Sequence, residues 1–408
     1  MTQKTAELLA PLVALSRKYG SDPAWVLAGG GNTSFKTADT LFVKASGFAL
    51  GSINAGGFCG MERAKLDAIW EKAYPADPAA REDEALADLM AARVAGETKR
   101  PSVETLLHGF FPQAYVVHTH PALVNGLTCG RGGESAFRRL FGREGIWVPF
   151  VDPGYTLAKV VRGLFEDFKA REGKSPSVMF MQNHGLLLAG NSPGEIDAIS
   201  ASIMARLDRE IALSGEARPD ETSAAVDAAA LAEFYLALRG LAGDSLGGNS
   251  PCILYRADRM ILGFAASPTA FTPLSRPYSP DHIVYAGHEY LRVDGCGDLG
   301  AAARTFADLR DAYLRNAWAD FLARNGAAPR IVLVKDLGAF AIAAAAAGTQ
   351  AAAAARSAAE RILDLFVDSC KVATYTKAFG GPLFMTPEAV AFIRNWEVEK
   401  YRSTIGAR

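Results

Sequence analysis

The sequence predicts an α/β protein of two domains. Strand-like and helix-like segments alternate along all 408 residues, and this alternation is typical of α/β folds. The length corresponds to two or three ordinary domains. Residues 214–229 are small and polar and contain Pro219, as expected of a linker. We therefore expect one domain at residues 1–215 and a second α/β domain at residues 216–408.

Periodicity and turn-forming residues predict the elements of the first domain in order. Leucines at helical spacing, followed by Gly20, predict a helix over residues 5–19. Short β-rich runs predict strands at residues 35–37, 41–45, 115–119, 178–182 and 186–189. Amphipathic runs predict helices at residues 61–74, 82–94, 102–111, 156–172 and 193–213.

The second domain mixes the same kinds of segment. We expect strands at residues 252–255, 260–264, 283–285 and 330–334, and helices at residues 301–321 and 350–367. RIVLVKDLGAFAIA at residues 330–343 has the same plan as MFMQNHGLLLAG at residues 179–190: an apolar strand, a glycine break and a second apolar strand, with a helix after it.

A second likeness links YSPDHIVYAGH at residues 278–288 with FFPQAYVVHTH at residues 110–120. Three histidines of the first domain, His118, His120 and His184, would then correspond to Ala286, His288 and Leu337. If these likenesses are real, the second domain is a degenerate repeat that lacks two of the three histidines and so has no metal site. The alternative is that they arose by chance, because the strand–glycine–strand pattern is common in α/β proteins.

Composition excludes several classes of partner. The net charge is -1 and basic residues are spread along the chain, so neither nucleic acid nor a membrane surface is an expected partner. The five cysteines form no CxxC pair and predict reduced thiols in a cytoplasmic protein. We expect no secretory signal peptide, because the N-terminal segment carries Glu7 and has no small-residue cleavage pattern. No run reaches the roughly 18–20 apolar residues of a membrane span.

Three of the six histidines suggest a metal site. His118 and His120 stand two apart at the end of a predicted strand, where side chains at i and i+2 share a face. His184, beside Gly185, is the natural third ligand, and three protein ligands with an open position are typical of catalytic zinc. The alternative is an ordinary polar strand end.

Glu104 is the candidate proton-transfer group. It lies early in a predicted helix, about one turn before His108. A carboxylate near a buried metal can ligate the ion or move protons. The alternative is a first-turn glutamate that stabilises the helix dipole.

Two small-residue turns suggest a phosphate site. Residues 29–34, GGGNTS, and residues 45–47, ASG, stand at predicted strand ends, where exposed backbone N–H groups can bind phosphate. Lys36 and Lys44 would add positive charge. The glycines match neither a P-loop nor a Rossmann fingerprint, and the alternative is simple turns.

In combination these segments resemble the class II aldolase/adducin family over roughly residues 5–213. The matching segments are GNTS at residues 31–34, VKASG at 43–47, PSVET at 101–105, FP at 111–112, VVHTH at 116–120 and NHG at 183–185. GGGNTSFK, VKASG and SVETLLHGFFP are also similar to the aldolase part of bifunctional rhamnulose-1-phosphate aldolase/alcohol dehydrogenase proteins. The second half resembles the segment that comes after the aldolase part in those proteins. We expect no dehydrogenase domain, because no GxxxGxG motif is present.

The resemblance implies a three-layer α/β/α domain with a central, mostly antiparallel sheet. It implies that His118, His120 and His184 bind zinc or another divalent metal, and that Glu104 is the catalytic acid/base. The implied phosphate-binding residues are Gly31, Asn32, Ser46, Gly47 and Ser102. The single-domain fuculose-phosphate-type aldolases have a second serine where this chain has Val103. The family also implies a homo-oligomer.

The activity implied by the resemblance is metal-dependent cleavage of a ketose 1-phosphate, similar to rhamnulose 1-phosphate, into dihydroxyacetone phosphate and an aldehyde. Sugar-phosphate 4-epimerase and sugar-acid-phosphate decarboxylase chemistry are alternatives on the same scaffold. The family's epimerases tend to have aspartate in place of Glu104, which favours the aldolase. A non-catalytic, adducin-like interaction module is a third possibility, but the three histidines argue against it.

Overall fold

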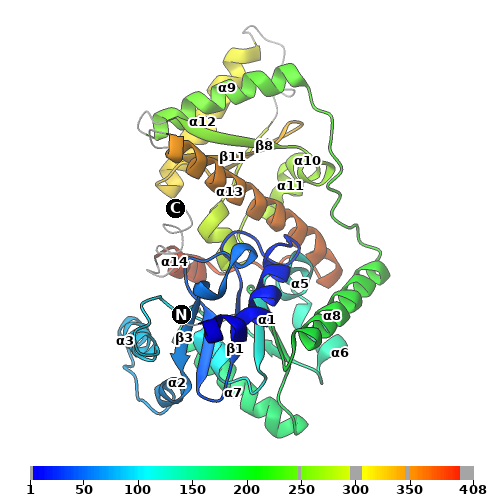
Figure 1. The fold of residues 1–408 in the computed structure, drawn as a ribbon. Coiled ribbons are helices and arrows are strands. Elements are labelled where there is room, and N and C mark those ends of the chain that lie inside the picture. Colours follow the sequence, from blue (N-terminus) through cyan, green and yellow to red (C-terminus); the bar gives the residue numbers. More distant parts are fainter. Residues whose placement is uncertain (1–2, 247–249, 295–305, 345–348, 396–408) are drawn as a thin grey trace. The chain divides into compact units, whose positions relative to one another are not determined.

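The computed structural model describes residues 3–246, 250–294, 306–344 and 349–395 (Figure 1). The chain divides into two compact units, and each has a sheet of its own. Unit 1 comprises Met1–Glu216 together with Thr376–Leu383, and unit 2 comprises Ala217–Tyr375 together with Phe384–Arg408.

Unit 1 is built on a seven-stranded sheet with the order β3-β2-β1-β4-β7-β6-β5. Its strands are β1 (Asn32–Lys36), β2 (Thr40–Lys44), β3 (Phe58–Glu62), β4 (Tyr115–Thr119), β5 (Ile146–Val148), β6 (Val178–Met181) and β7 (Gly185–Gly190). Every neighbouring pair is antiparallel except β5 and β6, which are parallel. The expectation of an α/β fold with a mostly antiparallel sheet is therefore confirmed.

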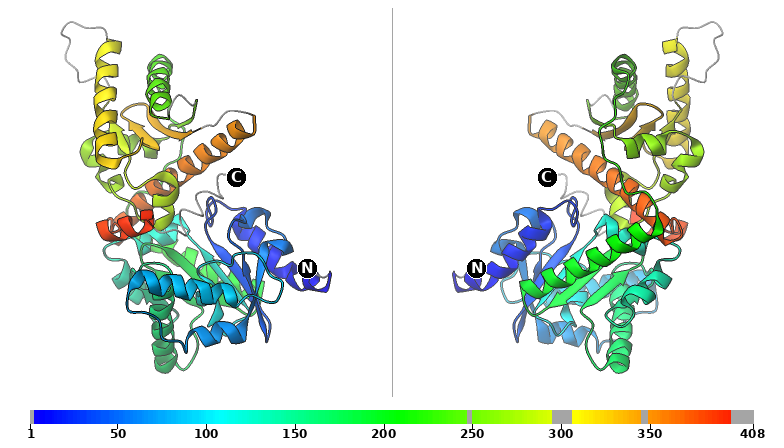
Figure 2. Two further views of the ribbon diagram at one scale, coloured as in Figure 1. Left: turned by 90° about the vertical axis from the view of Figure 1, so that its left-hand side faces the viewer. Right: turned by 90° about the vertical axis from the view of Figure 1, so that its right-hand side faces the viewer.

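Helices cover both faces of this sheet. They are α1 (Gln3–Gly20), α2 (Arg63–Ile69), α3 (Pro78–Ala91), α4 (Thr105–Gly109), α5 (Ala122–Thr128), α6 (Gly133–Phe141), α7 (Tyr155–Glu172) and α8 (Pro193–Ser214). α1 and α5 pack against α8 on one face, whereas α2, α3, α4 and α7 pack together on the other. Figure 2 shows α3 in front of the sheet in one view and α8 in front of it in the opposite view.

The second of these faces holds an apolar core that explains one error of the sequence-based prediction. Residues 61–74 were expected to be one helix, but β3 takes residues up to Glu62 and α2 begins at Arg63. Cys59 and Met61 alternate with residues on the other face and are fully buried in the core, so the segment fits a pleated strand. The short elements β5, α5 and α6 had no clear periodic signal and were not predicted.

The register of the sheet brings four chain segments to one end of it. β1 begins and β4 ends there, because Asn32 pairs with His118. β7 begins at the same end, because Thr119 pairs with Leu186. β2 runs antiparallel to β1, so its last residue, Lys44, also lies at this end. Predicted site segments that are distant in sequence therefore meet at one sheet end.

Unit 2 contains a four-stranded sheet with the order β8-β11-β10-β9. Its strands are β8 (Pro251–Arg256), β9 (Leu291–Val293), β10 (Ile331–Val334) and β11 (Gly338–Ala344). Its helices are α9 (Ala228–Ser245), α10 (Arg259–Ala265), α11 (Pro268–Phe271), α12 (Phe306–Asn325), α13 (Thr349–Thr376) and α14 (Pro387–Asn395). The core between the sheet and α9 and α12 includes Phe234, Trp318 and Phe340.

Two strands predicted in unit 2 are helices. Residues 260–264 lie in α10, because Asp258 Oδ1 accepts the N–H of Ile261 at 2.8 Å and so caps a helix. Residues 283–285 lie in a π-helix, His282–Ala286. Short apolar runs fit a buried helix as well as a strand, and here tertiary packing decides. The beginning of the helix expected at residues 301–321 lies outside the described residues.

The sheet of unit 2 reproduces one half of the sheet of unit 1. β8, β9, β10 and β11 pair in the same order and with the same directions as β4, β5, β6 and β7. The hairpin turns match as well, since Met181 pairs with Gly185 and Val334 pairs with Gly338. Asn183 and Asp336 stand at the same place in the two turns, with φ of 53° and 63°.

This correspondence corrects the repeat alignment. The counterpart of β4 is β8, and not residues 278–288. His118 pairs with Leu187, and Tyr255 pairs with Phe340. Leu187 and Phe340 each stand two residues after the glycine of their hairpin turn. Tyr255, Ala257 and Leu337 therefore occupy the places of His118, His120 and His184. The second sheet lacks all three histidines, instead of two.

Among the described residues, no helix is long and apolar enough to cross a membrane. The alanine-rich region near residue 345 divides between β11, which ends at Ala344, and α13, which begins at Thr349. Cys59, Cys129, Cys252 and Cys370 are free thiols, and Cys296 lies outside the described residues.

Candidate metal centre

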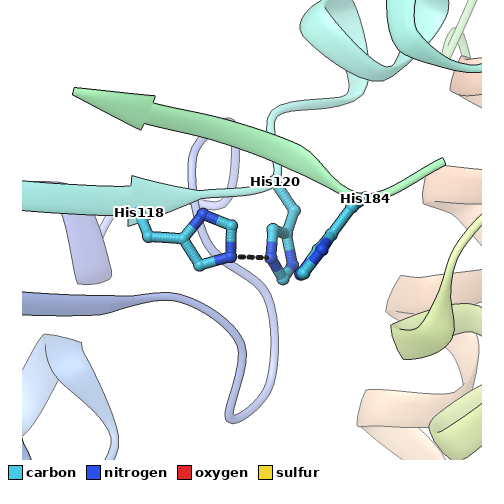
Figure 3. A group of neighbouring side chains, drawn as sticks. All are labelled: His118, His120 and His184. Carbon is cyan, nitrogen blue, oxygen red and sulfur yellow. Dashed lines mark hydrogen bonds between the residues drawn. The ribbon is translucent and has the colours of Figure 1, made fainter. Parts of the chain in front are cut away.

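Three imidazoles converge at the end of the unit 1 sheet. His118 belongs to β4, His120 comes directly after this strand, and His184 lies in the turn between β6 and β7 (Figure 3). One ring nitrogen of each lies within 4.8 Å of the others. His118 is buried and the other two are half-buried. The structure thus brings the three predicted ligands together, and it has no second such cluster among the residues that it describes.

The turn that carries His184 depends on its neighbours. Asn183 has a φ of 53°, a left-handed conformation that asparagine tolerates better than most residues. A Cβ on Gly185 would lie 2.5 Å from the Thr119 carbonyl oxygen and 2.6 Å from Cδ2 of His120. Glycine is therefore the residue that lets this hairpin approach His120 closely.

A backbone hydrogen bond orients His118 for metal binding. Its Nδ1 lies 2.9 Å from the carbonyl oxygen of Leu186, which can only accept, so Nδ1 carries the proton. In a neutral ring Nε2 then carries the lone pair that a metal ligand requires. This Nε2 lies 2.9 Å from Nε2 of His120, so a proton or a cation must sit between the two nitrogens. Three imidazole nitrogens this close together fit a divalent metal such as zinc.

Glu104 faces the same point. Its Oε1 lies 3.3 Å from Nε2 of His118 and 3.2 Å from Nε2 of His184. Burial alone would raise the pKa of the Glu104 carboxyl, but His118 and His184 outweigh burial and hold this pKa well below its usual range. Glu104 stands at the N-cap of α4, where its side chain makes no capping bond, and both of its carboxylate oxygens contact side chains of the site instead.

A directed hydrogen-bond chain holds the other oxygen of Glu104. Nδ2 of Asn32 donates to Glu104 Oε2 at 2.5 Å. The Oδ1 of Asn32 is in close contact with Nε2 of His108, which must donate. Nδ1 of His108 is then an acceptor for the hydroxyl of Ser34 at 2.7 Å. Burial lowers the pKa of His108 to about 3, which keeps the ring neutral and the chain of bonds directed.

This chain contains residues that sequence reasoning missed. His108 and Ser34 received no role, although His108 lies four residues after Glu104 and Ser34 lies within the GNTS motif. The side chain of Asn32, predicted to bind phosphate, is occupied by Glu104 and His108. It therefore positions Glu104 in this structure.

The other predicted phosphate residues lie in two neighbouring segments. The N–H of Ser46 donates to the Arg100 carbonyl oxygen at 2.8 Å, and the N–H of Ser102 donates to the Lys44 carbonyl oxygen at 3.2 Å. Gly47 comes after Ser46 with a φ of 89° and is exposed. Gly31, at the start of β1, has a φ of 66° and lies at the same end of the sheet.

Lys36 does not join this group. It stands at the far end of β1, and its Nζ donates to the carbonyl oxygens of Phe111 and Gln113 at 3.0 and 2.7 Å. Burial lowers the pKa of this ammonium to about 7. The added charge that the sequence suggested near the glycine turns is therefore not supplied by Lys36, whereas Lys44 ends β2 at the site end of the sheet.

Residues 10–199 match the family model described as the class II aldolase and adducin N-terminal domain. Unit 1 belongs to the class II aldolase and adducin family. The chain that carries this class II aldolase domain is also similar to part of a curated protein. That protein, the uncharacterized oxidoreductase YuxG of Bacillus subtilis (strain 168), is 33% identical over 192 residues, which are 44% of this chain and 26% of YuxG. The match thus spans about a quarter of the length of this relative.

Solved structures are similar to the class II aldolase domain over about half of the chain. The N-terminal class II aldolase domain of a conserved protein from Thermoplasma acidophilum is 31% identical, with a TM-score of 0.42, over 50% of this chain and 93% of that one. The L-fuculose-1-phosphate aldolase from Thermus thermophilus is 14% identical, with a TM-score of 0.34, over 50% of this chain and 94% of that one.

Proposed function

We propose that the chain is a zinc-dependent aldolase that cleaves a ketose 1-phosphate, similar to rhamnulose 1-phosphate, into dihydroxyacetone phosphate and an aldehyde. The observation that supports this proposal is the cluster of three imidazole nitrogens, two of which, on His118 and His184, lie 3.3 and 3.2 Å from one oxygen of Glu104. The family of unit 1 supports the same class of chemistry. The identity of the metal and of the sugar is part of the proposal.

The donor set fits a catalytic metal. His118, His120 and His184 would hold the ion, and three protein ligands leave a position open for substrate. When bound, zinc would act as a Lewis acid that stabilises negative charge developing on the oxygens of the ketose. The half-buried His120 and His184 leave this side of the site accessible, whereas buried His118 is held by its bond to the Leu186 carbonyl.

Glu104 would move the proton. Its Oε2 is held by Asn32, so Oε1 is the oxygen that faces the metal ligands and the substrate. In cleavage, the bond between the two fragments breaks and its electron pair remains on the carbon next to the ketone. The hydroxyl that becomes the aldehyde carbonyl loses its proton as this bond breaks, and Glu104 would take up that proton and deliver it to the carbon; in the condensation direction the same proton would return by the reverse route. A lysine Schiff base is not needed for this route.

The substrate phosphate would bind to the glycine and serine turns. Ser46, Gly47 and Ser102 are linked by backbone bonds of the segments that carry them, and Gly31 lies at the same end of the sheet. The N–H groups of Ser46 and Ser102 are used in these bonds, so the proposed phosphate donors are the hydroxyls of the two serines and the backbone N–H groups of the two glycines. We propose Asn32 as a residue that orients Glu104 beside this phosphate site. We further propose a cytoplasmic homo-oligomer, for which the free thiols indicate a reducing compartment.

The test combines substrate cleavage with metal content. Rhamnulose 1-phosphate, fuculose 1-phosphate and ribulose 1-phosphate are incubated with the full chain, and dihydroxyacetone phosphate is detected with a coupled enzyme. Zinc near one ion per chain, with cleavage of one sugar that is abolished in His120→Ala and Glu104→Gln, supports the proposal. Bound zinc without cleavage favours epimerase or decarboxylase chemistry. Absence of metal binding, even with zinc supplied, contradicts a catalytic role and favours an interaction module.

A further inference from the structure

A segment from the second half of the sequence belongs to the unit that contains the histidines. Residues 376–383, TKAFGGPL, belong to unit 1, although the residues before and after them belong to unit 2. We name these residues the anchor segment. Its 3-10 helix, Lys377–Phe379, packs against α5 and α8 of unit 1. Both of its ends are therefore covalently joined to unit 2.

The anchor segment makes backbone bonds with the loop after α5. Gly130 and Pro382 form an antiparallel bridge. The bonds on either side run from Leu383 N to Cys129 O at 2.7 Å, from Arg131 N to Gly381 O at 3.0 Å and from Gly132 N to Phe379 O at 2.7 Å. Several bonds in succession fix the position of one segment against another, much as in a short sheet.

The fit between the two segments is close. A Cβ on Gly130 would lie 2.6 Å from Cβ of Phe379, a side chain that is itself buried. Gly380 and Gly381 have φ values of 83° and 85°, which favour glycine at both positions. The contact thus depends on glycine on both sides.

The anchor segment also contacts the turn that carries His184. Nδ2 of Asn183 donates to the carbonyl oxygen of Leu383 at 2.8 Å, across 200 positions of sequence. The N–H of Asn183 donates to the Thr128 carbonyl oxygen at 3.1 Å, just before the loop that the anchor segment holds. Asn183 is therefore held on two sides, and the next residue is His184.

We propose that the anchor segment positions the metal centre by fixing Asn183 and, through it, the backbone that carries His184. This inference rests on the proposed metal-dependent function. It would give the second half of the chain a role in the chemistry of unit 1, because the anchor segment is joined to unit 2 at both of its ends. Residues that orient a metal ligand typically contribute 10–100-fold to metal affinity.

The first test uses Asn183→Gly in the full chain. Glycine keeps the left-handed backbone but removes the side-chain bond to Leu383. Zinc affinity is measured by competition with a chelating dye, starting from metal-free protein. We expect zinc binding about tenfold weaker than in the wild type. The matched control is Asp336→Gly, at the same place in the β10–β11 turn, which leaves zinc affinity unchanged.

The second test perturbs the anchor segment itself. Gly381→Ala strains a residue with a φ of 85° beside Arg131, whereas Gly215→Ala strains a residue with a φ of 73° that has nothing within 4 Å of its Cβ position. We expect zinc affinity to fall in Gly381→Ala only, although both variants of the metal-free protein melt at lower temperature. Excess zinc then restores the kcat of Gly381→Ala, and Gly215→Ala controls for a general loss of stability.

The outcomes separate the two proposals. Wild-type zinc affinity in Asn183→Gly and Gly381→Ala, with zinc binding abolished in His120→Ala, overturns the anchoring role and leaves the proposed function intact. A wild-type chain that binds no zinc, manganese or cobalt overturns the proposed function, and this inference with it. Weaker zinc binding in both variants, with both controls unchanged, supports the anchoring role.

Discussion

The turns β6–β7 and β10–β11 have the same backbone plan but different side chains. Each places a left-handed residue two positions before a glycine, at Asn183 and Asp336, and each opens a strand that pairs with an equivalent neighbour. The first turn carries His184 beside two further histidines. The second carries Leu337, whose carbonyl oxygen accepts the hydroxyl of Tyr255 at 2.6 Å. The two turns thus share their backbone plan, and only the first carries a histidine of the proposed metal site.

The same comparison applies to the glycines of the two turns. A Cβ on Gly185 would lie 2.5 Å from the Thr119 carbonyl oxygen, and one on Gly338 would lie 2.6 Å from the Arg256 carbonyl oxygen. The close approach is therefore a property of the hairpin, present with or without the histidines. The glycines of the two turns are therefore explained by the close backbone approach, independently of the proposed metal binding.

The largest effect is expected from the histidines themselves. His120→Ala removes one ligand of the proposed metal, so we expect loss of bound zinc and a fall in activity on the order of a thousandfold, since a bound metal contributes several kcal/mol of transition-state stabilisation. Metal analysis and the cleavage assay measure this. His288→Ala is the control, because the sequence alignment equated His288 with His120 but the structure does not. Equal losses in both variants would refute the structural alignment.

The next effect separates proton transfer from metal binding. Glu104→Gln keeps the size of the side chain and its contact with Asn32 but cannot move a proton. We expect kcat to fall by roughly 10²–10⁴-fold while zinc content stays near that of the wild type. Loss of zinc in this variant would show instead that Glu104 is a ligand. Steady-state kinetics with metal analysis on the same sample distinguishes the two.

A smaller effect tests the shared backbone. Gly185→Ala and Gly338→Ala each force a Cβ against a backbone carbonyl, and we expect each to lower the free energy of unfolding by about 1–3 kcal/mol. Only Gly185→Ala should also weaken zinc binding, because its Cβ would press on His120. Denaturant unfolding of the metal-free protein and zinc titration measure the two effects. Loss of zinc affinity in Gly338→Ala would contradict the separation.

The last effect is a dependence of stability on pH in unit 1. His108 has a pKa of about 3 in the folded protein and about 6.5 when unfolded. Below pH 6.5 the unfolded chain therefore binds a proton that the folded chain does not, and stability falls as pH falls. Between pH 6.5 and pH 5 we expect a loss of about 2 kcal/mol in the metal-free protein.

His108→Gln checks this origin. The variant lacks the titrating ring. Between pH 6.5 and pH 5 its free energy of unfolding should therefore fall by about 2 kcal/mol less than that of the wild type. Urea unfolding at several pH values measures the difference. An equal slope in the wild type and the variant would assign the pH dependence to other groups.

The sequence by itself determined the local part of the site. His118 and His120 share a strand face because side chains alternate along a strand, and NHG marks a tight turn at His184. Glu104 was found from its motif and its place at the start of a helix. The histidine signals involve neighbouring positions and can be recognised from local geometry, whereas the role of Glu104 was implied by the family resemblance.

Only the tertiary structure decided which distant residues support that site. The bonds that lead from Ser34 through His108 and Asn32 to Glu104 join two elements 72 or more positions apart, and the bond from Asn183 to Leu383 spans 200. The sequence also did not identify β8 as the counterpart of β4, because a short apolar run fits a strand or a helix equally well. Such contacts depend on how whole elements pack, and no local periodicity in the chain records that packing.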